Sequence, residues 1–469
     1  MKPWPCWRAT AIAAEDSFTV LVSEAPGETR WALLDARETV LEVVHQRAHR
    51  PEAGACLAGR VGKRLPGHRA AFVDVGVGPA GLLDAADTPE GLPPEGRLVL
   101  VQITRPAVGD KGPKLSAKIA LPGPFLVYTP HAPGIGLGAR VGKTATREAL
   151  RARLAALIEP HEGVIARTSA GAAEVTESHL ACDLAQARAA WNALEEAFAA
   201  ASRPGLLRPA PPPLDAWLTG PGGRAARVVV EGGTRLAEVR AHLAAHHPDW
   251  CGVLERHSDP LQALFEAFGV EAALEEALTP GVAVPGGGRV IVAETAAVSA
   301  IDVDAGGRDR NAVARAAVAV IAHQIRLRGL AGQIVIDFPR GGGGPDPALI
   351  AALGGALALD PAGPRVLGAT RGGLVEVNRP RRRAPLSEVL LDPQAPASLT
   401  PEAGVLGALR HIAQGRPGQR AHLEVGPRGA GLLNGPLAAA LAEAQARLGA
   451  PVTVSLRAGA DESVSLTFA

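Results

Sequence analysis

Val298-Ser-Ala-Ile-Asp302-Val-Asp304-Ala-Gly306 and Gly332-Gln-Ile-Val-Ile-Asp337-Phe338 are two short apolar stretches that each carry aspartate. Both predict strands, although aspartate is depleted in strands and is seldom buried without a partner. Because residues i and i+2 of a strand point to one face, Asp302 and Asp304 are expected to project together. If the two strands are neighbours, Asp337 joins them.

The segment between these strands predicts a helix. Its apolar residues recur at helical spacing, at Val313, Ala317, Val320, Ile321 and Ile325. Strand, helix and strand together predict a right-handed crossover to a parallel neighbour. Ligand sites in such sheets lie outside the carboxyl ends of the strands, which is where the aspartates are expected.

Two interpretations of these aspartates stay open on spacing alone. Three converging carboxylates without nearby thiols form a hard oxygen site that suits Mg²⁺ or Mn²⁺. Such an ion can activate water and stabilise charge on a phosphoryl group under attack. Alternatively, an aspartate at a strand end caps a helix or bonds a turn, and its role is structural.

Composition narrows the class of protein. A chain of 469 residues suggests about three domains. Its net charge of +1 does not indicate a nucleic-acid protein, so any anion binding must come from local patches. No apolar run has the length of a signal peptide or a membrane span, and a cytoplasmic protein without a membrane partner is expected. Four scattered cysteines without a C-x-x-C pair predict reduced thiols: Cys6, Cys56, Cys182 and Cys251.

Residues 57–104 differ in sequence pattern from the rest of the chain. Short strands with glycine turns predict a small barrel there, and an OB-fold is the commonest one that fits. Within it, Phe72 is either a core phenylalanine or a base-stacking platform. A strand over 226–230 and a helix over 234–245 resume the pattern of residues 16–44. The barrel and the segment after it are therefore expected to be insertions.

Two further segments carry positive charge. Arg379-Pro-Arg-Arg-Arg383, with Arg365 and Arg371 upstream, is either a solvated face or a contact to a phosphate backbone. The glycine-rich stretch from Gly134 to Thr144 lacks the spacing of a phosphate-binding loop. A flexible basic loop is the better interpretation of that stretch.

Taken together, these segments resemble the ribonuclease E/G family over most of the chain. The sharpest matches are Ala300-Ile-Asp-Val-Asp-Ala-Gly306, the segment from His323 to Phe338, and Gly373-Leu-Val-Glu-Val-Asn-Arg379. The resemblance implies a multidomain α/β protein. It has an RNase H-like fold interrupted by an OB-fold RNA-binding domain and a 5′-sensor domain, followed by a DNase I-like catalytic subdomain and a small C-terminal α/β domain.

The implied boundaries follow the changes in texture. They are 1–45 and 213–285 for the RNase H-like fold, 46–118 for the OB-fold, 119–212 for the 5′ sensor, 286–392 for the catalytic subdomain and 400–469 for the C-terminal domain.

The resemblance also implies an activity. Family members are Mg²⁺-dependent endoribonucleases that cut single-stranded RNA, favour 5′-monophosphorylated ends and act in RNA processing and decay. By this resemblance Asp302 and Asp337 hold Mg²⁺, with Mn²⁺ as an alternative, and Asp304 orients the attacking water. The implied RNA-binding residues are Phe72, Lys111, Arg379 and Arg381, and the implied 5′-phosphate-sensing residues are Arg167, Thr168, Arg140 and Arg365.

The chain departs from the family pattern at several positions. Asp304 stands where the family usually has asparagine, and Leu82 stands where it has a second barrel aromatic. The loop Gly341–Gly344 replaces an aspartate and a basic helix start. No cysteine pair follows Arg383, so no structural zinc is expected, and a homodimer without a zinc link stays open.

Because of these departures, an alternative function stays open: a catalytically weak or inactive RNA-binding paralogue. A phosphatase of small molecules is a remoter third. The length favours the shorter, ribonuclease G-like arrangement.

Overall fold

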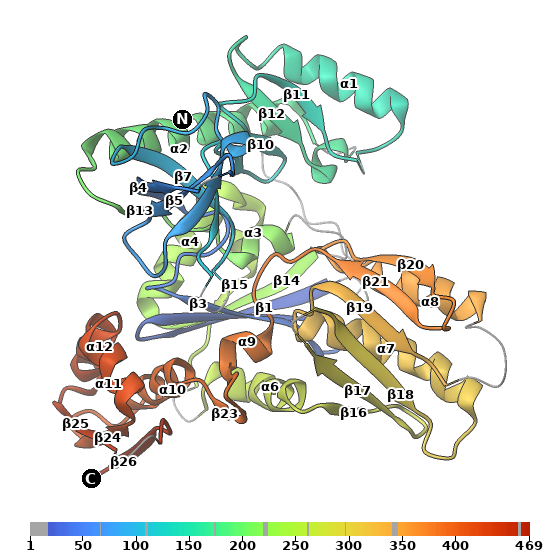
Figure 1. The fold of residues 1–469 in the computed structure, drawn as a ribbon, viewed down its shortest axis with the longest axis vertical. Coiled ribbons are helices and arrows are strands. Elements are labelled where there is room, and N and C mark those ends of the chain that lie inside the picture. Colours follow the sequence, from blue (N-terminus) through green and yellow to red (C-terminus); the bar gives the residue numbers. More distant parts are fainter. Residues whose placement is uncertain are drawn as a thin grey trace. The chain divides into compact units, whose positions relative to one another are not determined.

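The computed structural model is a mixed α/β protein with several sheets and a small barrel (Figure 1). Its described residues form two compact units, the first drawn from 50–220 and 238–252, and the second from 10–49, 221–237 and 253–469. The structure describes residues 17–65, 67–107, 111–139, 141–172, 175–218, 224–259, 262–295, 297–339, 346–457 and 461–469.

A five-stranded sheet in the second unit joins distant parts of the chain. Its order is β15-β14-β1-β2-β3, with β1 and β14 parallel. This pairing confirms that the chain returns to its N-terminal sheet after the intervening segments. The strands are β1 (Ser17–Ala25), β2 (Glu28–Leu34), β3 (Val40–Arg47), β14 (Arg224–Glu231) and β15 (Leu254–Arg256). The short helices α5 (Leu264–Ala267) and α6 (Val270–Leu278) contribute apolar residues to its core.

The six-stranded sheet of the second unit contains the two aspartate strands. Its order is β16-β17-β18-β19-β21-β20, and β18 and β19 are parallel neighbours, as predicted. The strands are β16 (Gly281–Ala283), β17 (Arg289–Glu294), β18 (Ser299–Asp304), β19 (Gly332–Asp337), β20 (Arg365–Ala369) and β21 (Val375–Arg379). The crossover between β18 and β19 is helix α7 (Arg310–Leu327), also as predicted.

Alternation along these strands divides the sheet into an apolar and a polar face. Ile301 and Val303 of β18, and Ile334 and Ile336 of β19, are buried. They share one core with α7 and with α8 (Pro347–Leu357). Residues at the alternate positions therefore point to the opposite face, because successive side chains of a strand alternate.

The small barrel lies in the first unit. Its strands are β4 (Cys56–Arg64), β5 (Ala70–Asp74), β6 (Gly81–Asp84), β7 (Leu98–Arg105) and β8 (Lys114–Ser116), and β13 (Gly205–Arg208) adds to β4. The ring closes because β4 pairs with both β5 and β7. Its core contains only small and aliphatic residues.

A second sheet of the first unit has the order β11-β12-β10-β9. Its strands are β9 (Leu121–Pro122), β10 (Leu126–Tyr128), β11 (Gly134–Leu137) and β12 (Gly163–Ala166). Helices α1 (Thr144–Ala155) and α2 (Glu177–Ala200) pack on it. Strand β11 replaces the first part of the flexible basic loop predicted from Gly134 onwards, because parallel pairing with β12 orders it.

The chain ends in a small α/β module of the second unit. Strands β24 (Ala421–Val425), β25 (Val452–Leu456) and β26 (Ser465–Phe468) form its sheet. Helices α10 (Pro401–Ala413), α11 (Pro427–Asn434) and α12 (Ala438–Leu448) complete its core. Before it come α9 (Leu386–Leu390), β22 (Leu391–Asp392) and β23 (Ala395–Leu399). Among the residues that the structure describes, no helix is both long and apolar enough to cross a membrane.

Candidate active site

Asp302 and Asp337 occupy equivalent positions on neighbouring parallel strands. They are direct register partners of β18 and β19. Neighbouring strands lie about 4.8 Å apart, so register partners place their side chains beside each other on one face. Both alternate with buried residues that face α7, so both project to the polar face. Asp302 is exposed and Asp337 is half-buried.

Asp304 lies two residues further along β18 and points to the same face as Asp302. Its Oδ1 accepts a hydrogen bond of 2.9 Å from the amide of Gly306. This bond closes the turn that leaves the strand, and Gly306 and Gly307 have φ values of 54° and 77° in the left-handed region. Glycine is favoured there because it has no Cβ to clash. The turn therefore holds one oxygen of Asp304 in place.

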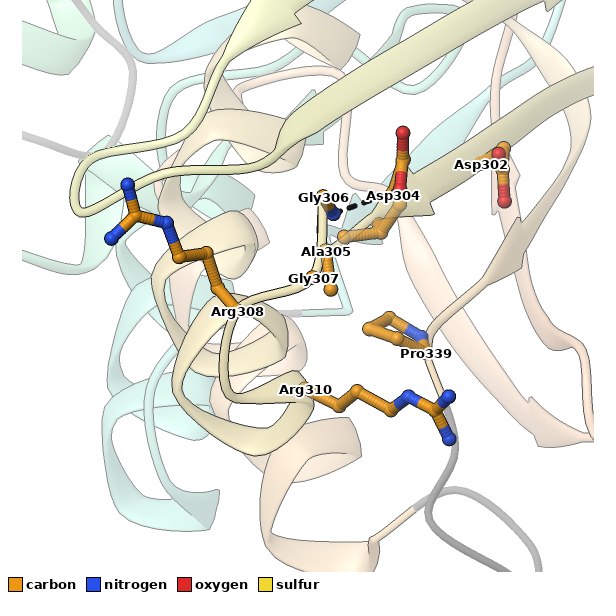
Figure 2. Close-up of a pocket in the computed structure, with 9 residues that line it drawn as sticks. Asp302, Asp304, Ala305, Gly306, Gly307, Arg308, Arg310 and Pro339 are labelled. Carbon is orange, nitrogen blue, oxygen red and sulfur yellow. Dashed lines mark hydrogen bonds between the residues drawn. The ribbon is translucent and has the colours of Figure 1, made fainter.

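A hollow of about 440 Å³ lies against Asp302 and Asp304, whereas Asp337 is not part of its lining. It is lined by Asp302, Val303, Asp304, Ala305, Gly306, Gly307, Arg308, Arg310 and Pro339. Figure 2 shows Asp302 and Asp304 side by side on the strand, with Arg310 extending toward Pro339 and Arg308 pointing away from the aspartates.

The two arginines were not among the predicted site residues. The available signal is their place in the sequence: both follow an aspartate strand at its carboxyl end, where ligand sites of such sheets form. Arg310 begins α7, whose first amides are capped by Asp309. The hollow thus presents both acidic and basic groups.

The donor set fits a hard divalent cation. Asp302 and Asp337 offer carboxylate oxygens from adjacent strands on an accessible face. Mg²⁺ binds through one or two carboxylates and keeps several water ligands, which an exposed position permits. The lining contains no thiol or imidazole that would favour a softer metal.

Arg379 does not lie on an open surface. It is 8% exposed, and its Nε donates to Asp360 Oδ2 at 2.6 Å while its Nη1 donates to the carbonyl of Leu330 at 2.9 Å. A buried, paired guanidinium is not available to an RNA backbone. The RNA contact predicted for Arg379 is therefore corrected to a structural ion pair.

The rest of the cationic run is partly neutralised. Arg381 pairs with Glu388 at 3.1 Å and Arg383 pairs with Glu42 at 3.1 Å. Both arginine side chains are about one-third exposed, so these pairs are weak and can exchange for another anion.

Phe72 lies on the outer surface of the barrel. It is 42% exposed, which excludes the core interpretation. Its register partner across the barrel sheet is Leu82, which is followed on the next strand by Lys114. Lys114 pairs with Asp87 at 3.2 Å, and Lys111 is exposed. Phe72, Leu82 and Lys114 thus lie side by side on three neighbouring strands of this surface.

Arg167 and Thr168 follow strand β12 in the first unit. Arg167 Nη1 donates to the carbonyl of Gly123 at 2.6 Å, and Thr168 is exposed. Asp183 braces the same loop by accepting the amides of Phe125 and Leu126, each at 2.8 Å. Burial raises the pKa of Asp183 to about 6, and these two amide bonds oppose the shift.

Three features predicted from the sequence cannot be assigned to the sites described above. Arg140 and the loop Gly341–Gly344 lie outside the described residues. Arg365 is exposed at the start of the edge strand β20, in the second unit. Its sensing role stays a prediction.

Known ribonucleases are similar to this chain over most of its length. The profile described as "Ribonuclease E/G family" matches residues 120–382. A Ribonuclease E from Nostoc sp. is 32% identical over 392 residues, covering 77% of this chain and 56% of that protein. A Ribonuclease E from Synechocystis sp. is 30% identical, with 80% of this chain and 58% of that protein covered. Ribonuclease G from Escherichia coli is 30% identical over 414 residues, 79% of this chain and 81% of that protein. The chain thus spans less than two-thirds of the two ribonuclease E relatives.

Proposed function

This chain belongs to the ribonuclease E/G family, and on that premise we propose that it is a Mg²⁺-dependent endoribonuclease of RNA processing and decay. One observation carries the proposal: Asp302 and Asp337 are register partners on adjacent parallel strands. Asp304 adds a third carboxylate on the same accessible face. The relatives carry the names Ribonuclease E and Ribonuclease G, which supports RNA as the substrate class.

Each site residue has a distinct role in this proposal. Asp302 and Asp337 would hold the cation, which would supply positive charge and lower the pKa of bound water. Asp304, held by the Gly306 amide, accepts a hydrogen bond from the attacking water and orients it. Arg310 lines the hollow and can contact the phosphate backbone.

The domain assignment is part of the same proposal. The sheet that joins β1 to β14 corresponds to the RNase H-like fold, and the closed barrel corresponds to the OB-fold RNA-binding domain. The sheet with β18 and β19 corresponds to the DNase I-like catalytic subdomain. The pairing of β1 with β14 and the closure of the barrel through β4 and β7 support this assignment.

The barrel surface is proposed to bind single-stranded RNA. Phe72 can stack on a base, because an exposed aromatic ring accepts any base regardless of sequence. Leu82 beside it offers apolar contact but no stacking face, so one ring carries this interaction. Lys111 adds a salt-sensitive phosphate contact.

The 5′ end is proposed to bind at Arg167 and Thr168. The Gly123 carbonyl orients the guanidinium of Arg167, and an oriented guanidinium can bind a terminal phosphate with two donors. A 5′-monophosphate would then be preferred over a triphosphate, because its terminal phosphate sits directly on the first nucleotide.

The first test is cleavage of a short single-stranded RNA with and without Mg²⁺. The wild type is expected to cleave only with Mg²⁺, and Asp302→Asn and Asp337→Asn are expected to lose cleavage. Glu443→Gln, which removes an exposed carboxylate from α12 in the C-terminal module, is the matched control and should retain it.

Two outcomes would contradict the proposal. Unaltered cleavage in both aspartate variants would remove the metal role. Salt-dependent RNA binding without cleavage at any divalent-ion concentration would instead support the RNA-binding paralogue. A parallel assay with matched 5′-monophosphate and 5′-triphosphate RNAs tests the sensor separately, because it compares two substrates of one enzyme.

A further inference from the structure

A second group of metal-ligating side chains meets within the first compact unit. Asp215 lies on α3 (Pro213–Leu218), and His242 and His247 lie at the C-terminal end of α4 (Gly233–His246). His242 Nε2 is 2.6 Å from Asp215 Oδ1, and His247 Nε2 is 3.0 Å from the same oxygen. The three ligand atoms all lie within 4.8 Å of one another.

Both helices carry buried apolar residues close in sequence to the three polar side chains. Leu214 and Trp217 of α3 are buried, as are Val239 and Leu243 of α4. The amide of His247 donates to the carbonyl of Leu243 at 2.7 Å and extends the last helical turn. Two histidines five residues apart thereby face one carboxylate on another helix.

The ligand set differs in chemistry from the candidate active site. Two imidazole nitrogens and one carboxylate oxygen are ligands that Zn²⁺ accepts, whereas Mg²⁺ favours oxygen ligands and retained water. Ligands about 2.0–2.2 Å from a tetrahedral Zn²⁺ lie roughly 3.3 Å from each other. The distances of 2.6 and 3.0 Å would need to widen by roughly 0.7 and 0.3 Å to reach this separation.

The surroundings also suit a cation. The side chain of His247 is 4% exposed, whereas those of His242 and Asp215 are 24% and 23% exposed. One side of the cluster is therefore enclosed by protein, and the other allows an ion to enter and a water to complete its coordination. The C-terminal end of α4 carries partial negative charge from the helix dipole, which favours a bound cation.

We propose that Asp215, His242 and His247 form a Zn²⁺ site that clamps α3 to the C-terminal end of α4. The ion takes three protein ligands and one water. The expectation that the chain has no structural zinc rests on cysteine spacing and does not concern these residues. The proposal is independent of the nuclease assignment.

The test measures Zn²⁺ binding to the full chain. The protein is stripped with a chelator and reloaded with Zn²⁺, its metal content is measured, and its affinity is determined by competition with a chromophoric chelator. The wild type is expected to bind one Zn²⁺ per chain. His242→Ala and His247→Ala are expected to weaken binding by more than about 100-fold, since losing even an outer-shell partner of a metal ligand costs 10–100-fold.

His246→Ala is the matched control. Its ring centroid is 4.7 Å from that of His242, yet His246 is not part of the ligand group. This variant should keep one Zn²⁺ per chain. Stoichiometric binding that persists in the His242→Ala/His247→Ala double variant would overturn the proposal.

Two further measurements keep the test valid if an alanine variant fails to fold. His242→Cys retains a zinc ligand, and its Co²⁺ form should gain a thiolate-to-cobalt charge-transfer band that the wild type lacks. Zn²⁺ should raise the Tm of the wild type but not of His247→Ala, because a ligand of the folded state stabilises it. Wild-type protein that neither competes for Zn²⁺ nor shifts in Tm would show a hydrogen-bonded cluster without metal.

Discussion

Arg379→Ala separates a structural role of the cationic run from a role in RNA binding. Asp360 is 3% exposed and accepts from the Nε of Arg379 at 2.6 Å and from its Nη2 at 3.4 Å. A third hydrogen bond reaches this carboxylate from the amide of Ala362 at 2.8 Å. The variant therefore leaves a buried carboxylate with one of three donors, and it also removes the donor to the Leu330 carbonyl.

The loss in free energy of unfolding follows from these lost hydrogen bonds. Removing one partner of a buried ion pair costs about 3–5 kcal/mol, because the other charge stays buried without compensation. At about 2–4 °C per kcal/mol, the Tm should fall by roughly 10 °C. The double variant Arg379→Met/Asp360→Leu should recover most of this loss, because an apolar pair of similar volume carries no desolvation penalty.

The assay combines thermal unfolding with RNA binding at several salt concentrations. Loss of one phosphate contact lowers the slope of log K against log salt by about 0.7 for a single strand. Arg379→Ala should leave this slope unchanged, whereas Arg382→Ala, at an exposed position in the same run, tests the surface contact. A reduced salt slope with unchanged Tm in Arg379→Ala would refute the structural role.

Four further predictions concern the other proposed roles. Phe72→Ala should weaken single-stranded RNA binding roughly 5- to 150-fold in a fluorescence titration, because one stacked base is worth about 1–3 kcal/mol, and should leave Tm nearly unchanged. Arg167→Lys should reduce the ratio of cleavage rates for 5′-monophosphate over 5′-triphosphate RNA, because lysine lacks the two-donor geometry; an unchanged ratio would exclude the sensor role. Asp304→Asn should slow cleavage and raise the Mg²⁺ concentration needed in a titration of the cleavage rate, because its one amide oxygen can accept from Gly306 or from the attacking water but not from both, and one negative charge is lost. The hydrogen bond from Arg188 lowers the pKa of Glu162 to about 2 from its usual 4.5, so the stability from this pair is present above pH 4.5 and is lost as the pH falls toward 2; urea unfolding across this range should show the loss in the wild type but much less of it in Arg188→Gln.

The local sequence pattern was sufficient to predict strands β18 and β19 and the helix α7 between them. Alternation along β18 and β19, the helical spacing of α7 and the handedness of crossovers together predict parallel neighbours with Asp302 and Asp337 on one face. These features act over a few residues, or obey chain-wide sterics, and are therefore visible in one sequence. The glycine-separated strands of the barrel belong to the same category.

Tertiary structure alone decided what each charged side chain contacts. Arg379 and Arg381 lie two residues apart in one cationic run, yet the first is buried on Asp360 and the second lies near the surface with Glu388. The exposure of Phe72 and the meeting of Asp215 with His242 and His247 are equally absent from the pattern. The physical reason is that burial and ion pairing depend on distances between elements far apart in the chain, whereas periodicity reports only which face of its own element a residue occupies.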